Sequence, residues 1–355
     1  MTRRIVIPLG CTLLVAAFAQ GQRPAGTGVP SVAVLIGVAD RVDPLEHRPR
    51  QNLVTYLVTA SPTAAQIAAR VNGLILPRAS GWWRVVVTRS CDRSPESQRS
   101  CADSISALPL SGPRVTVRPD TGRLAGAGDP CNFDYKALTF VSPTILGASQ
   151  HIGHSEKCDP RGWSWQDSHW IQRYDNDTLV AYTNWGDLAD SAFTQAWRKA
   201  VNVGSETRPA PPQDEQCQAD LDSIGSWGIV REQARWAPHV FQEQTTALCQ
   251  LEGPVNWRLP DSLVGFADPA VNWSGVTAVV PDAEYGFASP RSDFLLVALP
   301  DSFRLYTMTA GKPGAMLFQL PRKKGLGNER DQIVMLQWAG GSHAADWARA
   351  VTGAR

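Results

Sequence analysis

Hydrophobic and polar residues alternate over many short stretches of this chain, and a period of two residues predicts β-strands. Before residue 204 the predicted strands cover residues 31–38, 52–59, 82–88, 115–117, 137–141, 169–174 and 178–183. Beyond residue 216 they cover residues 224–230, 237–242, 276–280, 294–299, 304–309, 316–320 and 333–338. Gly and Pro residues separate the second group at short intervals, which indicates a mostly antiparallel arrangement.

Three stretches carry instead the three- and four-residue spacing of an amphipathic helix. Residues 64–75 have this spacing, with Ser61 placed to cap the helix and Pro62 at its first position. Residues 188–200 repeat Leu and Ala at the same spacing, and residues 346–351 form a helical turn. Strands and helices together predict an α+β protein.

A proline-rich polar stretch divides the chain. Residues 205–216, SETRPAPPQDEQ, combine three prolines with polar side chains and no apolar run, a composition typical of linkers. We expect a mixed α/β-sheet module over residues 31–204 and a mostly antiparallel β module over residues 217–355. A chain of 355 residues is long enough for two such modules.

The first residues have the pattern of an export signal. Arg3 and Arg4 precede an apolar run over residues 5–16, and Ala17-Phe18-Ala19 fits the small-x-small rule for cleavage before Gln20. The run is shorter than the roughly 20 residues that span a bilayer. An N-terminal anchor that is not cleaved remains the alternative.

These features predict a secreted or periplasmic protein. Residues 1–19 are the expected signal peptide, and residues 20–30 are small, polar and expected to be disordered. No later apolar stretch has the length of a membrane span, so we expect no transmembrane segment after signal removal.

The cysteines agree with export. Removal of Cys11 with the signal leaves an even number, which in an exported chain indicates three disulfides. Six cysteines allow 15 pairings. The spacing favours neighbours in order: Cys91 with Cys101, Cys131 with Cys158, and Cys217 with Cys249.

Charge excludes one class of partner. The chain has 34 Lys and Arg against 33 Asp and Glu, without the basic excess of nucleic-acid-binding proteins. The basic turn over residues 322–327 lacks the glycine spacing of nucleotide-binding loops. We therefore expect no nucleic-acid partner and no cofactor.

A cluster of tryptophans is the strongest sign of ligand binding. Trp163, Trp165 and Trp170 lie close together in the sequence, beside Asp167 and His169. Large aromatic rings next to polar groups suit a platform that stacks on a sugar or a peptide. Core packing is the competing interpretation, because such rings supply much of the apolar burial in any domain.

Two other groups contain residue types that carry chemistry. The first has the ligand types of a zinc site: His151, His154, Cys158 and His169. An even cysteine count favours a disulfide there instead. The second has the types of a hydrolase triad: Ser342, His343 and Asp346. No Gly-x-Ser-x-Gly segment accompanies it, so we assign no metal and no catalytic residue.

One resemblance runs through the N-terminal half. Val71-Asn72-Gly73-Leu74-Ile75 lies in a predicted helix, a β-rich run and an acidic turn follow, and Trp185-Gly186-Asp187-Leu188 begins the next helix. This order resembles the extracellular domain shared by RsiV-type anti-sigma lysozyme sensors and some peptidoglycan deacetylases. The resemblance covers residues 52–201. It implies a helix, a β-sheet and a second helix, and it assigns no catalytic residue.

Together these patterns predict an exported, non-enzymatic binding protein of the bacterial cell envelope, whose ligand is a protein or a glycan. A secreted hydrolase whose site is assembled from distant residues is the alternative. An enzyme should bring an acid, a base or a nucleophile together in one cleft, whereas a binding protein should expose aromatic rings without such convergence.

Overall fold

The computed structural model describes residues 31–39, 51–91, 100–110, 132–154, 164–175, 178–180, 227–243, 250–254, 259, 261–264, 271–323 and 330–352. The described part is mostly β-structure. Three short helices accompany the strands: α3 (Asp261–Val264), α4 (Trp273–Thr277) and α5 (Ser342–Thr352). None of the described helices is long and apolar enough to cross a membrane.

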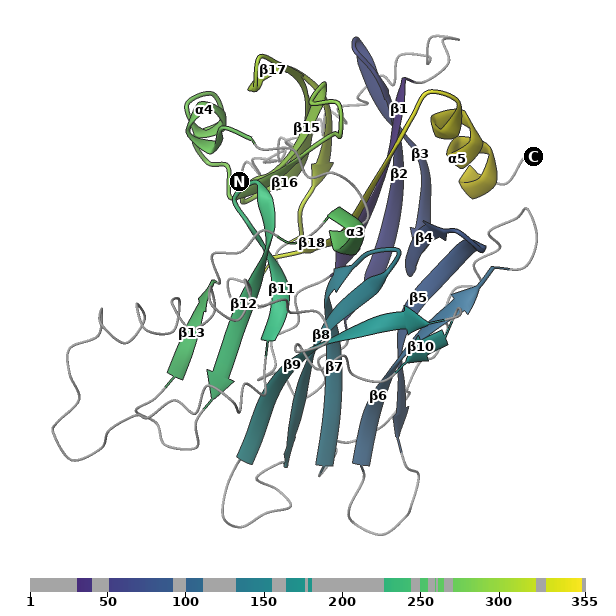
Figure 1. Ribbon diagram of the computed structural model, residues 1–355, viewed down its shortest axis with the longest axis vertical. Coiled ribbons are helices and arrows are strands. Elements are labelled where there is room, and N and C mark those ends of the chain that lie inside the picture. Colours follow the sequence, from purple (N-terminus) through teal and green to yellow (C-terminus); the bar gives the residue numbers. More distant parts are fainter. Residues whose placement is uncertain are drawn as a thin grey trace, which may run out of the picture.

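The strands form one large sheet and two small ones (Figure 1). The large sheet contains β1 (Val32–Ala39), β2 (Leu53–Ser61), β3 (Ala64–Asn72), β4 (Leu74–Arg78), β5 (Gly81–Cys91), β6 (Ser100–Pro109), β7 (Asn132–Val141), β8 (Ile145–His154), β9 (Ser164–Asp175), β10 (Thr178–Val180) and β18 (Gln332–Gly340). The small antiparallel sheets contain β11 (Trp227–Glu232), β12 (Arg235–Glu243) and β13 (Gln250–Pro254), and β14 (Tyr285–Ala288), β15 (Phe294–Ala298), β16 (Ser302–Thr309) and β17 (Lys312–Pro321).

Strand β1 is the centre of the large sheet. All eight of its residues are buried, and it pairs antiparallel with β2 on one side and β18 on the other. Alternate residues such as Val34 and Leu35 enter two different apolar cores on the two faces of the sheet. A strand buried on both faces is expected to read as a continuous apolar run, and VAVLIGVA does so.

Different elements of the protein pack against the large sheet in the two cores. The core around Val34 is shared with residues of both small sheets, such as Trp236 and Phe303. The core around Leu35 is shared with β4, β5 and α5. Figure 1 shows α5 beside β1, β2 and β3, with β5 below it. The long β5–β6 hairpin is therefore anchored in the second core.

The large sheet divides at β7. Along one edge β7 pairs with β8. Two other strands meet it in parallel: β18, through the Met335–Val141 pair, and β6, through residues 100–102 against 132–134. Because β6 departs after these few residues, the arm formed by β4, β5 and β6 leaves the main path of the sheet.

Arg322 connects a small sheet to the large one. Its Nη1 donates to the Leu299 carbonyl oxygen at 2.9 Å and to the Glu284 carboxylate, and its Nε donates to the Asp331 carbonyl oxygen at 2.5 Å. The guanidinium also lies 5.4 Å from the centroid of the Phe303 ring. A buried cation with this many acceptors fixes the segment that leads into β18.

The predicted helix over residues 64–75 is wrong, because this stretch forms β3 and β4. Ser61 pairs with Ala64 across a two-residue hairpin loop, so Pro62 opens a turn rather than a helix. Gly73, with φ of +87°, then bends the chain between β3 and β4. Pairing with β2 and β5 outweighs the high helix propensity of the alanines, because tertiary context overrides local propensity.

The predicted strand over residues 276–280 is also wrong. Residues 273–277 form α4, whose N-cap Asn272 accepts a hydrogen bond from the Gly275 amide through Oδ1 at 3.2 Å. The valines that suggested a strand place Val276 and Val280 four residues apart, on one buried side. Helical spacing of two buried valines fits this short segment.

Most other predicted strands are confirmed with shifted ends, and α5 confirms the helical turn near residue 346. The predicted elements over residues 115–117 and 188–200, and the linker over residues 205–216, lie outside the described residues. The division into two modules is not confirmed, because β18 pairs with β1 and β7 in the sheet built mainly from residues before 204.

Candidate functional site

Trp170, one residue of the predicted tryptophan platform, is buried. Its side chain is only 8% exposed and packs in the core that contains Leu35. The unbroken β8–β9 register places positions 165 and 170, five residues apart, on opposite faces of the sheet. Trp163 and the side chain of Trp165 lie outside the described residues. Trp170 therefore has the role of a core residue.

The β5–β6 hairpin instead carries both a buried polar cluster and an exposed aromatic surface. Its sequence GWWRVVVTRSC is rich in β-branched and aromatic residues, which favours a long strand. Trp83, Val85 and Val87 point into the core, whereas the even-numbered residues between them are half-buried or exposed. The hairpin register is unbroken from the Trp83–Pro109 pair to the Cys91–Cys101 pair.

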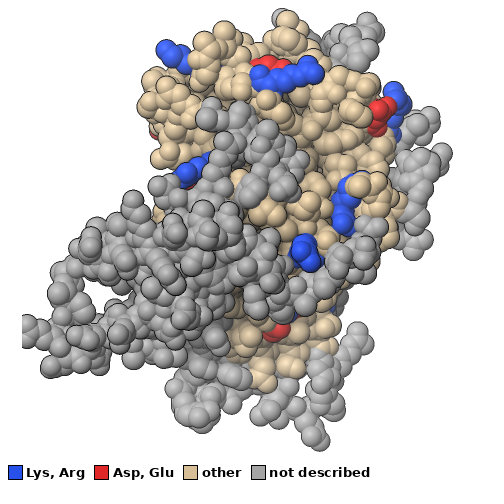
Figure 2. Space-filling view, in the orientation of Figure 1, with Lys and Arg blue, Asp and Glu red and all other residues tan. Residues whose placement is uncertain are grey.

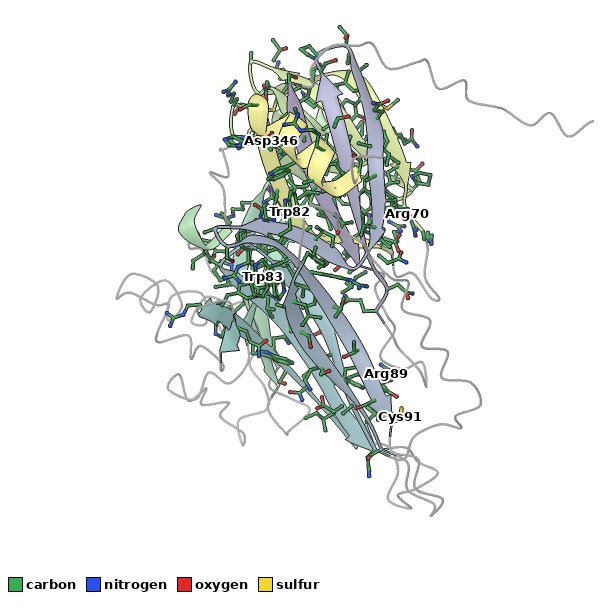
Figure 3. All side chains as sticks on the ribbon, turned by 90° about the vertical axis from the view of Figure 1, so that its right-hand side faces the viewer. Arg70, Trp82, Trp83, Arg89, Cys91 and Asp346 are labelled. Carbon is green, nitrogen blue, oxygen red and sulfur yellow. A yellow bond between two sulfur atoms is a disulfide. The ribbon has the colours of Figure 1, made fainter. Side chains whose placement is uncertain are left out.

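We call the first group, Arg89, Cys91, Cys101, Asp103 and Lys136, the locked end. Cys91 and Cys101 face each other across the hairpin and form a disulfide, which confirms one predicted pairing. The other four cysteines that were predicted to form disulfides lie outside the described residues. Figure 3 shows Arg89 and Cys91 at the end of β5 far from α5.

A buried ion pair lies beside the disulfide. Arg89 donates from Nε and Nη2 to the two carboxylate oxygens of Asp103, at 2.8 and 2.9 Å. The backbone amide of Lys136 donates to the same carboxylate at 3.1 Å, and its Nζ donates to the Asp103 carbonyl oxygen at 2.8 Å. The side chains of Arg89 and Asp103 are 6% and 3% exposed. Because both charges are removed from water, each is stabilised by the opposite charge of the other.

Aromatic rings continue the locked end onto β7 and β8. The Arg89 guanidinium lies 4.0 Å from the Tyr135 ring centroid, and Phe133 stacks on Tyr135 at 4.9 Å. His151 stacks on Phe133 at 5.4 Å. Within the described part of the chain no three His, Cys, Asp or Glu side chains gather in a way that suits a metal ion. In the described structure His151 therefore stacks on an aromatic ring and does not belong to a metal-binding group.

Arg78, the last residue of β4, lies between two aromatic rings. Arg78 lies 4.7 Å from the Trp83 ring and 4.4 Å from the Tyr174 ring, and its Nε donates to the Pro143 carbonyl oxygen at 3.0 Å. Burial raises the pKa of Tyr174, and the nearby Arg78 charge opposes this shift. Tyr174 therefore stays neutral at physiological pH.

At the opposite end of the hairpin, an arginine and aromatic rings are partly exposed, whereas at the locked end they are buried. We call Trp82, Arg84, Leu108 and Trp347 the tryptophan–arginine surface. The Trp82 and Trp347 rings meet edge to face at 5.8 Å, and both side chains are half-buried. Leu108, paired with Arg84 across the hairpin, is 53% exposed. Figure 3 shows Trp82 at the α5 end of β5.

Arg84 is the unusual member of this surface. No described residue accepts a hydrogen bond or forms an ion pair with its guanidinium, and its Nε is buried without a partner. A Cβ atom at Gly73 would lie 2.7 Å from this Nε, so the arginine crosses the turn where only glycine leaves room. A buried donor without an acceptor costs about 1–3 kcal/mol.

Polar groups further along the hairpin are already paired. The hydroxyls of Thr88 and Ser104 lie 2.8 Å apart, and Ser104 also donates to the Thr88 carbonyl oxygen at 3.4 Å. On the face drawn in Figure 2, Lys and Arg form separate spots on the described surface. Among the described residues, Arg84 thus combines a charge that has no ion-pair partner with apolar neighbours.

The residue types of a hydrolase triad do not assemble. His343 Nδ1 lies 3.9 Å from Asp346 Oδ2 on α5, with the two side chains 80% and 51% exposed. Asp346 is bound by Arg349, one turn further along the helix. An exposed imidazole beside a carboxylate that already pairs with arginine lacks the buried orientation of a catalytic base.

Comparison with protein-family models, with curated proteins and with solved structures finds no match for this chain. The resemblance to the sensor and deacetylase domain therefore stays a prediction.

Proposed function

We propose that the protein is an exported binding protein of the bacterial cell envelope, and that it binds a protein or a glycan through the tryptophan–arginine surface. The export signal, the even number of mature cysteines and the disulfide of the locked end support the location.

One observation carries the binding role. Two half-buried tryptophans from distant parts of the chain meet beside an exposed leucine and an arginine without an ion-pair partner among the described residues. Tryptophan and arginine are the residue types most enriched among those that dominate binding energy at interfaces. None of the four residues of this surface is a nucleophile, a general acid or a general base, so the surface favours binding over hydrolysis.

The test compares two exposed residues of equal accessibility. Leu108 and Met316 are each 53% exposed, and they lie on strands of different sheets. Leu108→Ser should weaken retention of the purified protein on an immobilised bacterial envelope extract, whereas Met316→Ser should not. Both variants should melt at the wild-type temperature, because exposed substitutions change stability by at most about 0.5 kcal/mol.

Equal retention of Leu108→Ser and wild type would refute the binding role of this surface. The location is tested separately. N-terminal sequencing of the exported protein should begin at Gln20 or within a few residues of it, and a mature chain that begins at Met1 would refute cleavage.

A further inference from the structure

We propose that the tryptophan–arginine surface binds an extended acidic peptide segment, with a carboxylate on Arg84 and an adjacent apolar side chain against Trp82 and Leu108. This inference rests on the proposed function and narrows its ligand. It assigns to Arg84 the role of the residue that determines specificity.

The same strand holds a second arginine, and that one does have a carboxylate partner. Arg89 meets Asp103 through Nε and Nη2, with both oxygens engaged. Arg84 lies five residues earlier on β5, on the opposite face, and its Nε has no acceptor. The residue opposite Arg84 on β6 is Leu108, where the position opposite Arg89 holds Asp103. Arg84 thus lacks the carboxylate that the hairpin supplies to Arg89.

The neighbours of Arg84 select an apolar group next to that carboxylate. Side chains directly opposite each other on paired strands are in reach of one another, and residues two apart on one strand share a face. Leu108 and Trp82 are related to Arg84 in these two ways. Desolvation by a leucine and a tryptophan strengthens a charge-assisted bond to the guanidinium.

The surface suits a peptide better than a glycan. A sugar needs many hydrogen-bonding groups, but the nearby Thr88 and Ser104 hydroxyls bond each other. An extended peptide brings backbone groups of its own. Among the described strands, β6 pairs with β7 only through residues 100–102, so its edge from residue 103 to 109 has no second strand partner. Such an edge accepts an added strand.

The experiment measures fluorescence anisotropy of two labelled probe peptides, acetyl-(Leu-Glu)3-amide and its neutral counterpart acetyl-(Leu-Gln)3-amide. The wild-type protein should bind the acidic probe about tenfold more tightly, as loss of one charged hydrogen-bond partner implies. Arg84→Gln should remove this preference, and Arg84→Lys should restore part of it, since lysine keeps the charge without the planar fork.

Arg70→Gln is the matched control. Arg70 is an exposed arginine on β3, 5.9 Å from the Tyr56 ring, and does not belong to the surface. Its variant should keep the wild-type preference for the acidic probe. Loss of the preference in both variants would assign it to net charge and overturn the role of Arg84.

Other outcomes separate the two proposals. Equal binding of the two probes by wild type overturns the acidic ligand, while the proposed function stands if Leu108→Ser still weakens retention on the envelope extract. Arg84-dependent binding of oligogalacturonate in place of the acidic probe overturns the peptide and favours an acidic glycan. A markedly lower melting temperature of Arg84→Gln would mean that Arg84 is paired within the protein, which also overturns the proposal.

Discussion

Each end of the β5–β6 hairpin holds one arginine, and the two arginines have opposite environments. At the locked end Arg89 is buried with its carboxylate partner Asp103, next to a disulfide and under aromatic rings. At the other end no described residue accepts a hydrogen bond from the Arg84 Nε, and Leu108 and the tryptophan pair lie partly in solvent. In our proposal, one end of the hairpin serves stability and the other end binds a partner.

The largest expected effect tests the ion pair of the locked end. Asp103→Ala leaves the Arg89 guanidinium buried without its counter-charge, so the free energy of unfolding should fall by about 3–5 kcal/mol. Urea denaturation followed by circular dichroism measures this. Asp346→Ala breaks an exposed pair with Arg349 and should cost less than about 1 kcal/mol. Losses of similar size would contradict the distinction between buried and exposed pairs.

The disulfide should matter somewhat less. Replacing Cys91 and Cys101 together by Ser opens a loop with a sequence separation of 10 residues. The unfolded chain gains conformational freedom, so we expect a loss of about 2–3 kcal/mol in the free energy of unfolding. The measurement compares the double variant with oxidised and reduced wild type. Equal stability of the reduced and the oxidised wild type would show that the disulfide does not stabilise the locked end.

A smaller effect is expected at the turn beneath Arg84. Gly73→Ala forces a side chain into a left-handed conformation and toward Arg84, at a cost of about 1–2 kcal/mol. Gly311→Ala is the control, because Gly311 has φ of +74° and open space around it. Thermal unfolding of the two variants isolates the contact with Arg84. Identical losses would mean that Arg84 moves aside freely.

The smallest effect belongs to Arg84 itself. Arg84→Met removes a charge that has no partner among the described residues and keeps much of the apolar stem. The free energy of unfolding should therefore not fall, since the variant also removes a buried donor that lacks an acceptor. Chemical denaturation is precise enough to show a loss as large as that of Asp103→Ala. Such a loss would mean that the two arginines are equivalent after all.

Part of this hairpin was predictable from sequence. The strand over residues 82–88 and the Cys91–Cys101 pairing follow from alternation and from cysteine spacing, and both are confirmed. Alternation also implies that Trp82 and Trp83 lie on opposite faces. Sequence alone does not tell which face is buried, because Trp83 shares its core with residues remote in the chain, such as Tyr174.

The tryptophan–arginine surface itself was not found from sequence. Clustering in the sequence predicts a platform of Trp163, Trp165 and Trp170. Trp82 and Trp347 are far apart in the sequence, and only the fold brings them into contact. The helix predicted over residues 64–75 failed for a related reason. Ser61 and Pro62 suit a hairpin turn as well as a helix start, and only pairing with β2 decides between the two.

The position of β18 has a consequence for how this protein reaches its native state. Val32 pairs with Gly340, so the most buried strand of the molecule finds one of its two partners near the other end of the chain. Contacts between residues so distant in sequence slow folding, because a very large loop must close before they form. Until then, the edges of β1 and β7 that receive β18 stay unpaired and prone to aggregation. A chain interrupted before residue 332 would lack β18 and would keep the edges of β1 and β7 unpaired.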